Sequence, residues 1–136
     1  MLSKLILIGL LLAPVYGQNT KSARRFAGSW EARFNGEVIC TIRIQTGKQM
    51  SGGMHACRLN VNEEGYLVQS DQADLFDAPS PLHEMKIVGD TLSFVEHDEG
   101  EKPLKMSLRL LSEGEAELRF VDAPIQIKPI RFERKR

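Results

Sequence analysis

The sequence predicts an all-β protein, folded as an antiparallel meander β-barrel of about eight strands or, alternatively, as a β-sandwich. Apolar and polar residues alternate along most of the chain after residue 25, which is the period of a strand with one buried face. Turn signals separate these runs at intervals of 8 to 14 residues, and no stretch has the spacing of a long amphipathic helix. Because the predicted strands follow one another as hairpins, the pattern favours an up-and-down barrel.

The length and composition indicate one ordinary globular domain. The chain has 136 residues, of which 42% are hydrophobic and 26% are charged, so it has enough apolar side chains to build a core. Its 18 basic and 18 acidic residues balance to a net charge of zero. This balance argues against a nucleic-acid binder held by neutralisation of phosphates.

The first 17 residues, MLSKLILIGLLLAPVYG, have the three-part organisation of a secretory signal peptide. A lysine precedes the apolar run from Leu5 to Ala13, and Val15 and Gly17 suit the −3 and −1 positions of a cleavage site. A transmembrane anchor is the alternative, but spanning a bilayer takes about 20 apolar residues. We therefore expect a secreted or periplasmic protein whose mature domain, residues 18–136, has no transmembrane segment.

The first two predicted strands form a hairpin. Asn35-Gly36, the strongest short hairpin signal, separates them. The side chains expected to face inward are Phe26, Gly28, Trp30, Ala32 and Phe34 in the first strand, and Val38, Cys40, Ile42 and Ile44 in the second.

A third strand follows the turn at residues 46–49, and Met50 resumes the apolar face. We expect a bulge at Gly52-Gly53, which would turn Cys57 inward beside Cys40. In an oxidising compartment an even cysteine count predicts a Cys40–Cys57 disulfide, worth roughly 3 kcal/mol of stability. The alternative is two buried free thiols that behave as small apolar residues.

The remaining strands have the same alternation, and the intervening segment is less regular. Their expected inward residues are Met85 and Ile87, then Leu92 and Phe94 after a Gly89-Asp90 turn, then Leu104, Met106, Leu108 and Leu110, then Ala116, Leu118 and Phe120, and finally Ile125 and Ile127, with a change of phase at Pro129 to Ile130 and Phe132. Residues 62–81 are acidic and predict a crossover or lid. Tyr66–Gln69 fits a strand, and Ser70–Phe76 fits either a strand or a short helix capped by Ser70.

Phe26, Gly28 and Trp30, together with the layout of strands, resemble the calycin group, which contains the lipocalins and fatty-acid-binding proteins. Turn-rich runs such as VGDTLSF also resemble uncharacterised secreted bacterial domains with a lipocalin-like barrel. The resemblance implies that Trp30 lies at the closed end of the barrel, with Arg131 or Arg134 of the last strand over its ring. It brings no activity with it, and the Thr-Asp-Tyr loop motif of lipocalins is absent from this sequence.

The residues with catalytic potential are few and scattered. His55, His83 and His97 have no metal-ligand spacing on one element, no serine has the surroundings of a nucleophile elbow, and no phosphate-binding loop is present. We therefore expect no catalytic residues, metal or cofactor, and a non-enzymatic function. The alternative is a hydrolase-type enzyme that uses His55 or His97 with nearby carboxylates.

The expected inward face mixes large and small side chains, and a barrel of about eight strands either fills its interior or holds one small ligand. The sequence leaves both outcomes open. If a small apolar or amphipathic ligand binds inside, the candidate wall residues are Trp30, Phe34, Ile42, Phe94, Met106 and Phe120.

Charge is unevenly distributed along the mature chain. Residues 18–61 carry seven basic and two acidic side chains, residues 62–122 carry five and fifteen, and residues 123–136 carry five and one. If the first and last strands pair, the basic termini form one patch that could dock to an anionic envelope surface. The cations concerned are Lys21, Arg24, Arg25, Arg131, Arg134, Lys135 and Arg136. A solvated, frayed terminus is the simpler alternative.

Overall fold

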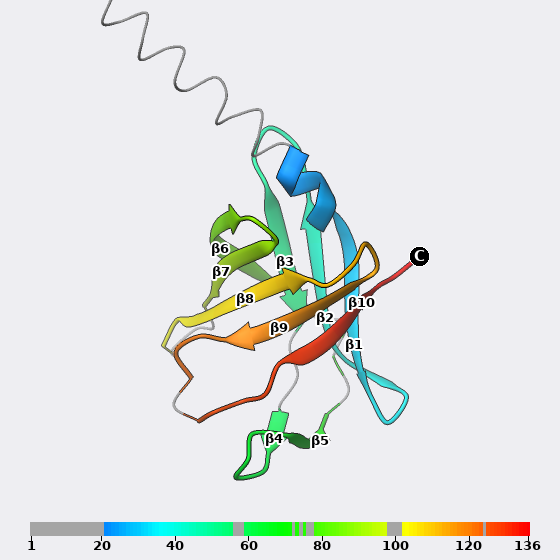
Figure 1. Cartoon of the computed structure of the whole chain (residues 1–136), viewed down its shortest axis with the longest axis vertical. Helices are drawn as coiled ribbons and strands as arrows, with labels where there is room; N and C mark the ends of the chain where they lie inside the picture. Colours follow the sequence, from blue (N-terminus) through cyan, green and yellow to red (C-terminus); the bar gives the residue numbers. More distant parts are fainter. Residues whose placement is uncertain are drawn as a thin grey trace, which may run out of the picture.

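The protein folds as a closed antiparallel barrel of eight strands (Figure 1). The structure is a computed structural model that describes residues 21–55, 59–71, 73, 75, 78–97, 102–123 and 125–136. Its strands are β1 Gly28–Phe34, β2 Glu37–Gln45, β3 Ser51–His55, β4 Leu59–Val61, β5 Leu67–Ser70, β6 Ser80–Val88, β7 Thr91–Glu96, β8 Leu104–Leu110, β9 Glu115–Phe120 and β10 Ile130–Arg134. The predicted signal peptide lies outside the described residues.

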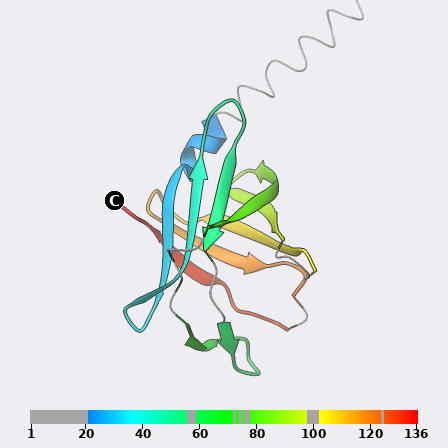
Figure 2. The same cartoon turned by 180° about the vertical axis from the view of Figure 1, so that it is seen from behind.

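The barrel is a meander, as the sequence predicted. Its order is β1-β10-β9-β8-β7-β6-β3-β2, so that neighbours are consecutive in the chain once the separate β4–β5 hairpin is left out. The pairing of β1 with β10 closes the barrel. A short helix, residues 21–26, lies at one end and the β4–β5 hairpin at the other, in both views (Figures 1 and 2).

The core lies inside the barrel and is formed mainly by the predicted inward residues. It comprises Phe26, Trp30, Ala32, Ile39, Cys40, Ile42, Ile44, Met54, Leu82, Leu92, Phe94, Met106, Leu108, Leu110, Ala116, Leu118 and Phe132. Phe26 belongs to the helix rather than to β1, yet it is fully buried. The expected turns are also present, since Asn35 and Gly36 both have positive φ, at 52° and 81°, as a tight hairpin turn requires.

The predicted bulge position in the first strands was wrong. The register of β2 with β3 runs from Gln45↔Ser51 to Thr41↔His55 without a shift, so Gly52-Gly53 forms no bulge there. The glycines instead allow close packing, because a Cβ on Gly52 would lie 2.7 Å from the Arg43 carbonyl oxygen. The bulge is at Ile39, where Ala32 pairs with Cys40 but Arg33 pairs with Val38.

The last predicted strand is shorter than expected. β10 begins at Ile130, and Ile125 and Ile127 precede it in irregular structure, with Ile125 59% exposed. The amide of Lys128 is used elsewhere, since it donates a hydrogen bond of 2.8 Å to the carbonyl of Gly65. A contact with the β4–β5 hairpin thus replaces the expected sheet pairing here.

Residues 62–81 contain the predicted strand, now β5, which pairs with β4. Ser70 is the last residue of β5, and its hydroxyl donates to the Asp71 carbonyl. The stretch Ser70–Phe76 lies partly outside the described residues; residues 71, 73 and 75 are described, and none of them is helical. In the part of the chain that the structure covers, no helix is long and apolar enough to cross a membrane.

Candidate functional site

Trp30 and Arg134 organise the helix end of the barrel. The indole Nε1 of the fully buried Trp30 donates to the Phe26 carbonyl at 2.9 Å. The Arg134 guanidinium lies 4.4 Å from the centroid of the Trp30 ring, so the predicted cation over the ring is confirmed. Gly28, at φ 118°, lies close to this guanidinium, since a Cβ there would lie 3.4 Å from Arg134 Nη1.

The hydrogen bonds of Arg134 show that its role is structural. Its guanidinium donates to the carbonyls of Glu113, Arg25 and Ala27, which belong to the β8–β9 turn, the helix and the start of β1. Arg131, the other candidate for the ring contact, instead forms an ion pair with Glu115. Arg134 therefore ties residues 25–27 to the β8–β9 turn at the helix end of the barrel.

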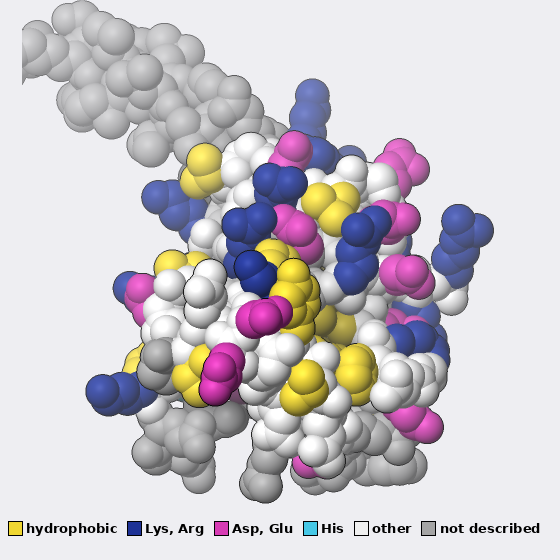
Figure 3. All heavy atoms as spheres, turned by 60° about the horizontal axis from the view of Figure 1, so that its bottom comes forward, with side chains coloured by type: hydrophobic (Ala, Val, Ile, Leu, Met, Phe, Trp, Pro, Cys, Tyr) yellow, Lys and Arg dark blue, Asp and Glu magenta, His cyan; other side chains and the backbone are white. Residues whose placement is uncertain are grey.

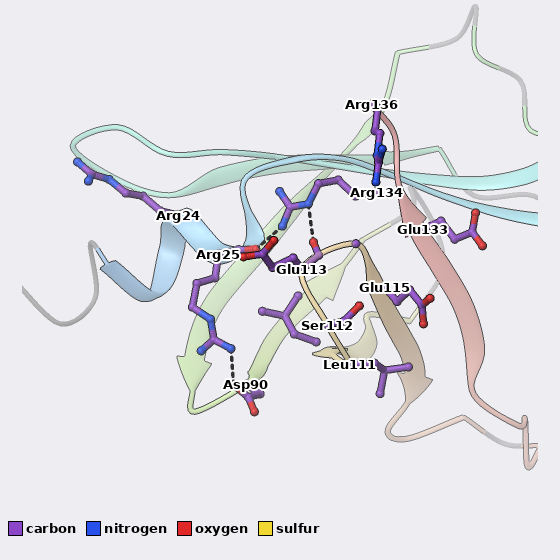
Figure 4. A pocket seen from close by; sticks show the side chains of 12 residues that line it. Arg24, Arg25, Asp90, Leu111, Ser112, Glu113, Glu115, Glu133, Arg134 and Arg136 are labelled. Atoms are coloured by element: carbon purple, nitrogen blue, oxygen red, sulfur yellow. Dashed lines mark hydrogen bonds and ion pairs between the residues drawn. The ribbon is translucent and has the colours of Figure 1, made fainter.

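A cleft of about 850 Å³ lies beside this end, between the helix, the β6–β7 and β8–β9 turns and β10 (Figure 4). It brings together basic residues of the two termini, as the pairing of β1 with β10 implies. Carboxylates line it in equal number, however, so its charged residues are Arg24, Arg25, Arg134 and Arg136 with Asp90, Glu113, Glu115 and Glu133. The cleft is consequently a mixed-charge surface rather than a purely basic patch.

Two of the four arginines of the cleft, Arg25 and Arg134, make defined contacts. Arg25 Nη2 lies 2.6 Å from Asp90 Oδ1 in an exposed ion pair, and Arg134 is engaged as described above. Figure 4 places Arg24 and Arg136 on opposite sides of the cleft. Figure 3, in which the hairpin end of the barrel comes forward, also shows basic and acidic side chains interspersed.

The six predicted ligand-wall residues do come together inside the barrel. Trp30 pairs with Ile42, and Met106 pairs with both Phe94 and Phe120. Trp30, Ile42, Phe94 and Met106 are at most 1% exposed. A side chain beside a water-sized void would expose part of its surface to that void, so the middle of the barrel is filled around these four residues.

The other two predicted wall residues, Phe34 and Phe120, are only partly buried. Phe34 ends β1, and Phe120 ends β9 directly before the loop that contacts the β4–β5 hairpin. Leu59 and Leu67 of that hairpin also pack against the core. The partly open apolar part of the predicted wall is therefore at the hairpin end.

The hairpin is docked on the β9–β10 loop by specific contacts. Besides the hydrogen bond from Lys128 to Gly65, the Lys128 ammonium lies 5.7 Å from the centroid of the Tyr66 ring. Gly65 has φ 90°, and a Cβ there would lie 2.5 Å from the Gln126 carbonyl oxygen. The side-chain oxygen of Asn62 accepts from the amides of Glu64 and Tyr66 and so fixes the hairpin loop.

Exposed hydrophobic side chains gather on these same two segments. Among the described residues, seven large hydrophobic side chains are exposed, and four of them belong to the hairpin or the β9–β10 loop. These four are Tyr66, Val68, Val121 and Ile125, between 53% and 59% exposed. The hairpin and the loop on which it docks therefore carry more exposed apolar side chains than the rest of the described chain.

The histidines form one contact that the sequence reasoning missed. His83 of β6 and His97, just after β7, have ring centroids 4.9 Å apart. Counting outward from the Gly89-Asp90 turn could have placed them near one another. His55 lies elsewhere, with its Nδ1 3.1 Å from the Thr41 hydroxyl. No group of three or more His, Cys, Asp or Glu side chains in the described ranges could hold a metal ion.

The predicted disulfide cannot be followed at both ends. Cys40 is buried in the core, at 1% exposure, whereas Cys57 lies outside the described residues. The Cys40–Cys57 bridge therefore stays a prediction.

Comparison with known proteins gives no relative from which a role could be transferred. The chain matches no protein-family model, no curated protein and no solved structure. Its function has to be argued from its own residues.

Proposed function

We propose that this chain is a secreted, non-enzymatic protein of calycin-like architecture that binds a small apolar or amphipathic ligand at the hairpin end of its barrel. The observation that carries the proposal is the contrast along the barrel. The middle of the barrel is filled, since Trp30, Phe94 and Met106 are each at most 1% exposed. Phe34 and Phe120, at the hairpin end, are only partly buried.

The chemistry of this end suits a ligand with an apolar body. Two phenylalanine rings supply the apolar contact, and Leu59 and Leu67 of the hairpin also pack against the core. Burying a hydrocarbon chain against such side chains yields about 25 cal/mol for each Å² removed from water. The Lys128 ammonium, close to the Tyr66 ring, is a cation at the same end that could pair with an acidic head group.

The ligand would then lie nearer the hairpin end than the wall residues expected from the sequence alone. Trp30, Ile42, Phe94 and Met106 then form the floor of the site rather than its wall. The β4–β5 hairpin would have the role of the lid expected for residues 62–81, since it packs against the core and docks on the β9–β10 loop.

The experiment is a titration of the purified chain with hexadecanoate, followed by displacement of a fluorescent apolar probe. We expect Phe34→Ala and Phe120→Ala each to weaken binding about tenfold, because each removes an apolar contact worth about 1.5 kcal/mol. Met50→Ala is the matched control, since Met50 is also partly buried against the core but lines a hollow beside the helix. Equal weakening by all three variants would contradict the proposed location.

A second candidate is a filled barrel that docks to an anionic envelope surface through its terminal cations. The pairing of β1 with β10 favours it, because this pairing brings the basic ends together. The four carboxylates in the same cleft oppose it, so we assign the binding role to the hairpin end. Binding to anionic vesicles that falls steeply with added salt would reverse this choice.

A further inference from the structure

Two exposed histidines, His83 of β6 and His97 just after β7, lie in edge-to-face ring contact with each other. The register pairs Leu82 with Glu96 and His83 with Val95, so His97 lies diagonally across from His83. The two rings are 4.9 Å apart between centroids and inclined by 77°. Both side chains are exposed, and among the described residues each imidazole ring contacts the other.

The backbone around the pair is well anchored. Leu82 and Val95, which flank the histidines, are 8% and 7% exposed, so both strands are held by packing. The β6 strand bulges immediately after His83, where Glu84 has φ 52° and the register with β7 shifts. The sheet therefore positions the backbone of His83 and the residue before His97, so the two histidines start close together.

The spacing agrees with the geometry of bound imidazoles. A zinc–nitrogen bond of about 2.0–2.1 Å places each ring centroid about 3.2 Å from the ion, so two neighbouring ligands have centroids about 4.5–5.2 Å apart. The observed 4.9 Å falls within that interval. Imidazole nitrogen also suits borderline cations such as Zn²⁺ and Cu²⁺ better than hard cations such as Mg²⁺.

We propose that His83 and His97 together bind one divalent transition-metal ion of the zinc class, through one ring nitrogen each, with water in the remaining positions. The site is independent of the proposed ligand site at the hairpin end. The bound ion would link the end of β7 to β6 across the bulge and so hold the strand ends together.

The test is calorimetric titration of the full exported chain, free of any affinity tag, with zinc chloride. We expect His83→Ala and His97→Ala each to lower the affinity for zinc at least about tenfold. Removing a residue that only hydrogen-bonds to a metal ligand already costs about that much, and removing a ligand should cost no less. His55→Ala is the matched control, because it also removes an imidazole but lies on β3, and its affinity should stay that of the parent. Magnesium should not bind measurably.

Three results would overturn the proposal. They are no zinc binding by the parent chain, unchanged binding by the His83 and His97 variants, or an equal loss in the His55 variant. Thermal unfolding of each variant verifies that it is folded, and the exposed positions of His83 and His97 make a folding failure unexpected. In the parent chain, zinc should shift the imidazole resonances of both residues in NMR spectra and leave those of His55 in place.

Discussion

At the scale of single residues, Arg134 does more for the fold than its place near the C-terminus suggests. It covers the Trp30 ring and donates to three backbone carbonyls from two chain segments, residues 25–27 and the β8–β9 turn. Because those carbonyls lie where no strand partner is available, the arginine satisfies groups that would otherwise depend on water. The Gly28-x-Trp30 motif and Arg134 therefore act as one unit.

Arg134→Ala tests this unit. We expect the variant to lose about 2–3 kcal/mol of stability, from the cation–π contact and the charged hydrogen bonds together. Arg131→Ala is the control, because Arg131 forms an exposed ion pair with Glu115, and such pairs contribute at most about 1 kcal/mol. Urea denaturation measures both, and equal losses would show that Arg134 is only another surface charge.

At the scale of elements, the docking of the β4–β5 hairpin depends on Gly65. Its φ of 90° and its closeness to the Gln126 carbonyl leave no room for a side chain. The hydrogen bond from Lys128 to Gly65 joins the hairpin to the β9–β10 loop at the same point. This hydrogen bond and the Lys128–Tyr66 contact are both made to the β9–β10 loop, so their loss would release the hairpin loop without removing a strand of the barrel.

Gly65→Ala should therefore undock the hairpin while the barrel stays folded. We expect the amide of Lys128 to lose its protection from hydrogen exchange, while core amides such as that of Leu118 keep theirs. Gly36→Ala is the control, because Gly36 also has positive φ, but a Cβ added there would have no atom within 4 Å. Unchanged protection at Lys128 would show that the hairpin is held by other contacts.

The strands themselves were predictable, since each depends on local alternation and on turn residues such as Asn35-Gly36. The predictions that were wrong concern features that depend on contacts with residues distant in the sequence. Ile39 rather than Gly52-Gly53 forms the bulge because β2 must match β1 and β3 at once. Likewise Ile125 leaves the sheet because its loop contacts the hairpin, which no local pattern encodes.

The candidate sites were predictable to a smaller extent. The six wall residues do face one interior. Alternation does not reveal how tightly side chains pack, so it could not distinguish the filled middle of the barrel from its more open hairpin end. The contact of His83 with His97 depends on the register of β6 and β7, which the bulge at Glu84 shifts. Arg134 over Trp30 was predicted only through the resemblance to calycins, and the structure bears it out.

At the scale of the whole molecule, the two ends of the barrel differ in chemistry. The helix end carries Trp30 with Arg134 over its ring, and beside them the mixed-charge cleft. The hairpin end carries partly open aromatic side chains and exposed hydrophobic residues. A filled barrel with one apolar end is suited to holding a ligand at that end, while the other end is held together by structural contacts.

The most direct test is native mass spectrometry of the exported protein before and after extraction with organic solvent. We predict an additional mass that extraction removes and that added hexadecanoate restores. The same spectrum should give a chain beginning at Gln18, and a deficit of about two daltons for the Cys40–Cys57 disulfide. A single mass that neither extraction nor added hexadecanoate changes would contradict the claim that this barrel binds an apolar ligand.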